Sequence, residues 1–138
     1  MGRILAIDYG KKRTGLAVSD PMQMIAGGLA TVESRKVIDY LRNYAAAEKV
    51  ELFILGEPRR MSYEPSENML RVEQFRQKLQ KAIPSIDIQM VDERFTSVLA
   101  HRAMIEGGLK KSRRQDKALV DELSAIILLQ TYLETIRK

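Results

Sequence analysis

Acidic side chains stand directly after several short apolar runs of this sequence. The residues in these positions are Asp8, Glu57, Asp92 and Glu93. Because the carboxyl ends of parallel strands share one edge of a sheet, carboxylates at those ends can converge on a single site. Clustered carboxylates without histidine or cysteine favour hard cations. The pattern therefore predicts a site for Mg²⁺ or Mn²⁺.

A further candidate ligand lies in the last apolar segment. Asp121 belongs to KALVDELSAIILLQTYL, a predicted helix that is apolar around most of its circumference. A carboxylate covered in this way costs free energy unless it is paired or binds a metal. Two cations about 3.5–4 Å apart can stabilise the attacking and leaving oxygens of a phosphodiester displacement, and a bound metal lowers the pKa of its water. Phosphodiester hydrolysis is the chemistry that this set of acids suggests.

Each acid also has a simpler interpretation. A single Asp at the end of a strand is most often a turn or cap residue. Asp121 could form a helical ion pair with Lys117, one turn earlier. The segment Asp92-Glu93-Arg94 could be an ordinary charged loop. Only the combined placement of the acids at one sheet edge favours a metal site.

Two basic segments flank the candidate ligands in sequence. Lys11, Lys12 and Arg13 follow Asp8. Five cations precede Asp121: Lys110, Lys111, Arg113, Arg114 and Lys117. Such groups could hold a phosphate backbone across an acidic centre, although a solvated loop is the alternative for the second segment. With 6% aromatic residues, extensive base stacking is not expected.

Composition limits the classes of protein. The chain has 138 residues, of which 45% are hydrophobic and 30% charged, and this is typical of one globular domain over residues 1–138. The net charge of +5 and the pI of about 9.6 suit a polyanionic partner. Without cysteine and with one histidine, thiol chemistry and multi-histidine metal sites are excluded. No apolar run approaches the roughly 20 residues of a membrane helix, so we expect a cytoplasmic protein.

Apolar periodicity predicts a mixed α/β fold. Five strands are expected, at 4–7, 14–19, 28–32, 52–55 and 86–90. Helices are expected after a possible cap at Ser34, from Met69 until Pro84, over 97–106 and from about 116 to 136, with a loop at 59–66. The first three strands are joined by short loops and should be antiparallel, whereas the later ones follow helices and should be parallel. The prediction is a five-stranded mixed sheet flanked by helices.

Three separated motifs resemble those of the YqgF family, also called RuvX. They are IDYGKKRTGLAVSD at 7–20, DERFTS at 92–97 and VDELSAIILLQTYL at 120–133. The resemblance implies a ribonuclease H-like fold related to the RuvC resolvases. It also implies a Holliday junction resolvase or, in bacteria, a nuclease that matures the 5′ end of pre-16S ribosomal RNA. Carried over by position, the acidic site would be Asp8, Glu93 with Asp92 adjacent, and Asp121.

The sequence departs from the family at the fourth strand. The family usually reads Gly-Leu-Pro there, followed by a polar segment with Asp-Gly, whereas this chain has Gly56-Glu57-Pro58 and then no glycine before position 67. Related resolvases carry a carboxylate on this strand. Our hypothesis is that Glu57 lies close enough to Asp8 to join or tune the metal site.

We therefore expect a metal-dependent endonuclease for ribosomal RNA precursors, acting on structured RNA or within a ribosomal particle. In this prediction the phosphate backbone of the RNA is positioned by Lys11, Lys12, Arg13, Arg94 and the loop 110–117. A resolvase of branched DNA is the alternative, and it would need a homodimer rather than a monomer to cut two opposed strands. A nucleic-acid-binding, ribosome-associated module with little catalysis is the third possibility. A sugar kinase is disfavoured, because 138 residues do not supply a second lobe.

Overall fold

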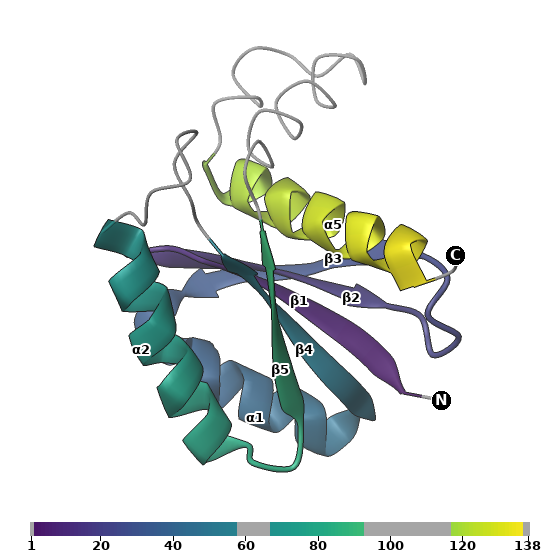
Figure 1. Cartoon of the computed structure of the whole chain (residues 1–138), viewed down its shortest axis with the longest axis horizontal. Helices are drawn as coiled ribbons and strands as arrows, with labels where there is room; N and C mark the ends of the chain where they lie inside the picture. Colours follow the sequence, from purple (N-terminus) through teal and green to yellow (C-terminus); the bar gives the residue numbers. More distant parts are fainter. Residues whose placement is uncertain (1, 58–66, 93–116, 137–138) are drawn as a thin grey trace.

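The protein forms a five-stranded sheet with helices on both faces (Figure 1). The computed structural model describes residues 2–57, 67–92 and 117–136. The strands are β1 (Arg3–Tyr9), β2 (Arg13–Ser19), β3 (Ala26–Glu33), β4 (Val50–Glu57) and β5 (Asp87–Asp92). The helices within the described ranges are the 3₁₀ turn η1 (Ser34–Lys36), α1 (Val37–Ala47), α2 (Glu67–Ala82) and α5 (Lys117–Ile136).

The sheet topology confirms the mixed arrangement. The strand order is β3-β2-β1-β4-β5, with β1–β2 and β2–β3 antiparallel and with β4 parallel to both β1 and β5. Most strands extend beyond the predicted apolar runs. Flanking polar residues such as Arg3 and Arg13 pair in the ladder although they do not add to the apolar signal. At its other end β1 continues past the expected strand 4–7 to Tyr9, so Asp8 lies inside the strand and not just after it.

Alternation of side chains along the strands divides the core into two layers. On one face Leu5, Ile7 and Leu55 pack in the layer that α1 and α2 cover. On the other face Ile4, Ala6, Ala17 and Ile54 meet α5 through Ala125, Leu128, Leu129 and Leu133. Figure 1 shows α5 alone on its side of the sheet, among the described helices. The face on which a strand residue lies is therefore set by its parity along the strand.

The turn between β1 and β2 is held by Ser34. Its hydroxyl donates to the carbonyl of Gly10 (2.5 Å) and shares a hydrogen bond with the Thr14 hydroxyl (2.8 Å). Ser34 was expected as a helix cap, but α1 has Lys36 at its N-cap and no side-chain capping bond. The backbone NH of Ser34 also donates to the carbonyl of Lys12 (2.9 Å). Ser34 therefore fastens the start of η1 to the tip of the β1–β2 hairpin.

Two predicted elements lie outside the described residues, namely the loop 59–66 and the helix 97–106. The predicted helices from Met69 until Pro84 and from about 116 to 136 correspond to α2 and α5. None of the described helices has the length and apolarity needed to cross a membrane.

Candidate active site

Asp8 is the first residue of the candidate site, and its neighbours in the sheet are glycines. Within β1 it pairs with Gly15 of β2. On the other side Ile7 pairs with Leu55 of β4, so the next residue along β4 is Gly56. Asp8 is two residues after Ala6 in β1, so both residues lie on the face of the sheet that α5 covers. Because neither glycine has a side chain, the two neighbouring strands place only backbone beside Asp8 on this face.

The start of α5 lies toward the same end of β1. Glu122 of α5 lies against Gly28 of β3, and eight residues later the Gln130 side chain accepts from the backbone NH of Ala26 (3.3 Å). Since β3 runs parallel to β1, moving from Gln130 back to Glu122 moves toward the carboxyl end of β1. Asp121 directly precedes Glu122, and its backbone is thereby carried toward the Asp8 end of the sheet. The Asp121 side chain lies outside the described part.

Glu57 and Asp8 are not brought together on one face. Gly56 pairs with Val91, which packs in the α5 layer, so the next pair belongs to the opposite face. That pair is Glu57 with Asp92, at the ends of β4 and β5. Glu57 therefore shares the face of Leu55, with α1 and α2. Because side chains alternate between the two faces along each strand, Glu57 and Asp8 lie on opposite faces of the sheet, although both stand at its carboxyl edge.

Several predicted residues lie outside the described part of the chain. These are Glu93, Arg94, Lys110, Lys111, Arg113 and Arg114, and the side chains of Asp92, Lys117 and Asp121. Within the described ranges, no three acidic or histidine side chains are grouped closely enough to hold a metal. The described part of the site thus consists of Asp8, its glycine neighbours and the approach of α5.

The predicted basic residues after Asp8 lie at the surface. Lys11 and Lys12 are exposed in the β1–β2 turn, and Arg13 begins β2 opposite Glu33. The two lysines, Glu33 and Arg35 line an open cleft of about 370 Å³. Glu33 accepts from Arg35 (3.1 Å) and pairs with Lys36 (3.3 Å). These two cations lower the pKa of the Glu33 carboxyl, most strongly through the Arg35 hydrogen bond.

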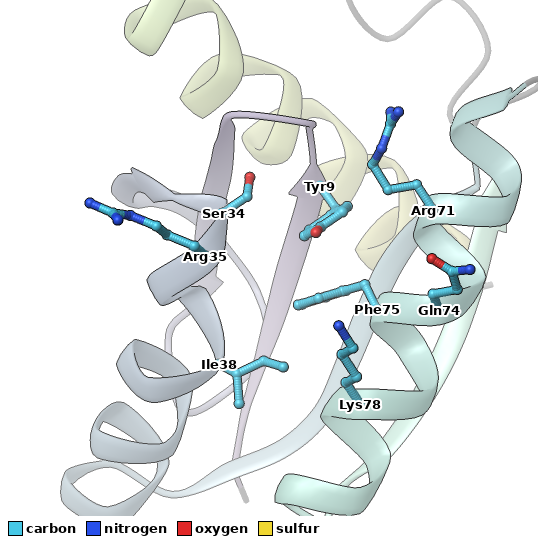
Figure 2. A pocket seen from close by; sticks show the side chains of 8 residues that line it. All are labelled: Tyr9, Ser34, Arg35, Ile38, Arg71, Gln74, Phe75 and Lys78. Atoms are coloured by element: carbon cyan, nitrogen blue, oxygen red, sulfur yellow. The ribbon is translucent and has the colours of Figure 1, made fainter.

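A second cavity, which the sequence reasoning missed, adjoins this cleft. It has a volume of about 170 Å³, and Figure 2 shows it between the η1–α1 segment and α2, at the end of β1. Its lining residues are Tyr9, Ser34, Arg35, Ile38, Arg71, Gln74, Phe75 and Lys78. The residues from α2 follow the i, i+3, i+4, i+7 spacing of one helical face. The sequence contains this spacing. However, Phe75 is the only one of these α2 residues that contributes to the apolar pattern that predicts the helix, so the pattern does not indicate a cavity.

Comparison with known proteins identifies the family. Residues 2–135 match the model of RuvX, described as a Holliday junction resolvase. The chain belongs to the RuvX family. It is 67% identical over the full length of both chains to a protein of Azobacteroides pseudotrichonymphae genomovar. CFP2 named "Putative pre-16S rRNA nuclease". A protein of Parabacteroides distasonis with the same name is 61% identical, covering 98% of this chain and 96% of the relative. The family predicted from the motifs is confirmed.

Solved structures confirm the ribonuclease H-like fold of this RuvX chain. Thermus thermophilus RuvC in complex with a Holliday junction substrate superposes with a TM-score of 0.61 at 14% identity, covering 99% of this chain and 96% of that one. Fowlpox virus resolvase with Holliday junction DNA superposes with a TM-score of 0.55 at 13% identity, covering 99% of each chain. At these identities the likeness concerns the fold.

Proposed function

We propose that this chain is a metal-dependent endonuclease that matures the 5′ end of pre-16S ribosomal RNA by phosphodiester hydrolysis. The observation that carries the proposal is the identity of 67% to a relative named as a pre-16S rRNA nuclease, with each chain covered completely. The position of Asp8 at the carboxyl edge of the sheet, between two glycines, supports a hydrolytic site at that edge.

We assign the catalytic and metal-binding roles to Asp8, Glu93 and Asp121. Asp8 supplies a carboxylate on the α5 face, and α5 carries Asp121 toward that end of the sheet. Glu93 follows the last residue of β5. Asp92 and Glu57 are register partners on the face opposite Asp8, so we assign them weaker, supporting roles at the same edge of the sheet.

The donor chemistry of these residues fits a hard divalent cation. All of the proposed ligands are carboxylates, and the chain has no cysteine. When bound, Mg²⁺ or Mn²⁺ supplies charge neutralisation at the scissile phosphate and favours ionisation of the attacking water. The protein's own contribution is to hold Asp8 rigidly in the central strand, which lies between β2 and β4. That position fixes the carboxylate relative to a phosphate at the sheet edge.

The basic groups near Asp8 are assigned to the RNA backbone. Lys11 and Lys12 project from the turn that follows β1, and Arg13 begins β2. Cations at these positions attract phosphates without selecting a sequence, so specificity must come from RNA shape or from a ribosomal partner. We place Arg94 and the basic segment 110–117 in the same role. The proposal locates the reaction in the cytoplasm, where ribosomal precursors are processed.

A direct test is a cleavage assay with purified protein and Mn²⁺. A labelled 16S precursor and a four-way DNA junction would be compared side by side, with Asp8→Asn as the inactive variant and Asp39→Asn, on the exposed side of α1, as control. We expect cleavage of the RNA near its mature 5′ end and a loss of at least about 100-fold in Asp8→Asn, because the metal contributes several kcal/mol to the transition state. Cleavage of the junction alone would contradict the proposal and favour a resolvase.

A further inference from the structure

We infer that the 170 Å³ cavity between η1–α1 and α2 binds a backbone phosphate of single-stranded RNA, at a subsite separate from the acidic centre. The inference rests on the proposed function, because it takes RNA as the ligand. It extends the proposed function by assigning a binding position for a part of the RNA strand away from the cleaved bond. Neither the family name nor the names of the relatives assign any role to this cavity.

The charge of the cavity is the first argument. Three of the described residues that line it are cations, namely Arg35, Arg71 and Lys78. None of the described lining residues is acidic. Figure 2 shows Arg71 and Lys78 two turns apart on the same side of α2, with Gln74 between them. In this view the Lys78 ammonium is directed toward Phe75 and the interior of the cavity. Arginine and lysine side chains form strong, charge-assisted hydrogen bonds to phosphate oxygens.

The construction of the cavity is the second argument, because its wall is rigid. The rings of Tyr9 and Phe75 stack with centroids 4.2 Å apart and planes 17° from parallel. Phe75 is buried in the core, so α2 and the end of β1 are held together at this point. On the opposite side Ser34 is fastened to Gly10 and Thr14. The backbone that carries the donors is therefore already in place, and only their side chains must be ordered when a phosphate binds.

The size of the cavity selects a small group. Pockets for drug-sized ligands measure roughly 300–1,000 Å³. A cavity of about 170 Å³ suits one phosphate with part of its sugar, not a whole dinucleotide or a base pair. The adjoining cleft at Lys11 and Lys12 shares Arg35 with it, so positive charge continues from the cavity to the β1–β2 turn. This continuity favours a strand, which carries many phosphates, over an isolated nucleotide.

The position of the cavity relative to Asp8 is the third argument. Tyr9 lines the cavity and directly follows Asp8, but the two residues lie on opposite faces of β1. An RNA strand that passes over the carboxyl end of β1 can therefore present one phosphate near Asp8 and another at Arg71 and Lys78. The cavity would anchor the strand and hold the scissile phosphate in register with the acidic centre.

The test is a binding experiment that does not depend on cleavage. Full-length protein in EDTA would be titrated with a fluorescein-labelled single-stranded oligoribonucleotide at several salt concentrations. The variants are Lys78→Gln and, as matched control, Lys81→Gln, because both lysines are exposed on α2 and only Lys78 lines the cavity. Exposed substitutions of this kind change stability by less than about 0.5 kcal/mol, so both variants should fold.

We expect Lys78→Gln to weaken binding about five- to tenfold at low salt and to reduce the slope of log K against log salt by about 0.7, the value for one contact to a single strand. Lys81→Gln should leave the affinity within about twofold. Equal effects of the two substitutions would overturn the inference. An additional arm with adenosine monophosphate would follow the side-chain amide of Gln74 by NMR. Saturation there by the mononucleotide, with no response to the oligonucleotide, would also overturn it.

The outcome is separable from that of the proposed function. Binding in EDTA requires no active metal centre, so a failure of cleavage leaves this measurement intact. Conversely, active enzyme whose RNA affinity does not depend on Lys78 would refute the cavity while leaving the nuclease assignment in place.

Discussion

The carboxylate of Glu122 lies against Gly28, at a point where α5 crosses β3. A β-carbon added at Gly28 would overlap a carboxylate oxygen of Glu122 and would lie 3.1 Å from its Cγ. The absence of a side chain at Gly28 therefore lets the start of α5 approach the sheet while carrying a polar residue. Because Asp121 is the preceding residue of α5, this contact also bears on the position of a proposed ligand.

Substitution of Gly28 should reveal that contact in the stability of the protein. Alanine replacing a strand glycine normally gains about 0.5–1 kcal/mol of backbone entropy. At Gly27 the new β-carbon would meet only the Val18 carbonyl, at 3.9 Å, so Gly27→Ala should show the full gain in urea unfolding. Gly28→Ala should gain about 1 kcal/mol less, because Glu122 must leave its rotamer. In a Glu122→Ala background the two glycine variants should become equal, and a persistent difference would contradict the contact.

The two carboxylates at the carboxyl edge should respond differently to substitution. Asp8 lies on the α5 face and Glu57 on the face of α1 and α2. We expect Asp8→Asn to weaken Mn²⁺ binding at least tenfold in calorimetry, since it removes a proposed ligand. Glu57→Gln should change the affinity by less than about threefold. A loss in Glu57→Gln as large as that in Asp8→Asn would show that Glu57 reaches around the strand end, as the first hypothesis required.

Two deeply buried serines in the described part of the chain should respond differently when their hydroxyls are removed. Ser19 and Ser124 are each 1% exposed. The Ser19 hydroxyl accepts from the backbone NH of Ile4 and donates to the carbonyl of Asp20, both at 2.9 Å. The Ser124 hydroxyl has no hydrogen-bond partner among the described residues. Ser19→Ala should therefore cost about 1–3 kcal/mol, and Ser124→Ala should be neutral or stabilising by about 1 kcal/mol.

Thermal or urea unfolding of both variants checks this prediction. A destabilisation of Ser124→Ala comparable to that of Ser19→Ala would mean that the Ser124 hydroxyl makes a bond beyond the described part of the chain. Because Ser124 lies one turn after Asp121 on α5, that result would indicate a hydrogen bond of Ser124 close to the proposed acidic site.

The loop between β2 and β3 should loosen in acid. The Asp20 carboxylate accepts backbone hydrogen bonds from Met22 (3.2 Å), Met24 (2.7 Å) and Ile25 (2.9 Å). These bonds, of which that from Ile25 has the largest effect, lower the pKa of Asp20 below its ordinary value of 3.8. A lowered pKa in the folded state means that the stabilisation is fully present above the unfolded pKa, near 4, and is lost as the pH falls through the folded value.

The measurement is the pH dependence of amide exchange or proteolysis at residues 22–25. We expect protection to fall below about pH 4 in the native sequence. Asp20→Asn should lack this transition, whereas Asp39→Asn, which removes a carboxylate from α1, should retain it. A transition that survives in Asp20→Asn would assign the pH sensitivity to another group.

Much of the fold follows from local patterns in the sequence. Alternating or continuous apolar runs identified all five strands, because the period of apolar residues reflects local backbone geometry. Helical spacing identified α1 and α2, and a long segment that is apolar around most of its circumference identified α5. Short connections between the first three strands implied antiparallel pairing, and helical connections implied parallel pairing, as observed. The three motifs at 7–20, 92–97 and 120–133 together indicated the family, which the family model and the full-length relatives confirm.

The tertiary structure decided which residues meet. Asp8 and Glu57 both stand at strand ends, but their faces depend on the register between β1 and β4, which neither strand specifies alone. The cavity at Arg71 and Lys78 exists because Tyr9 stacks on Phe75 across 66 residues of sequence, bringing α2 beside the end of β1. A local pattern determines how each segment is built. The juxtaposition of segments is set by packing across the whole sheet, where each side chain's partners are distant in the chain.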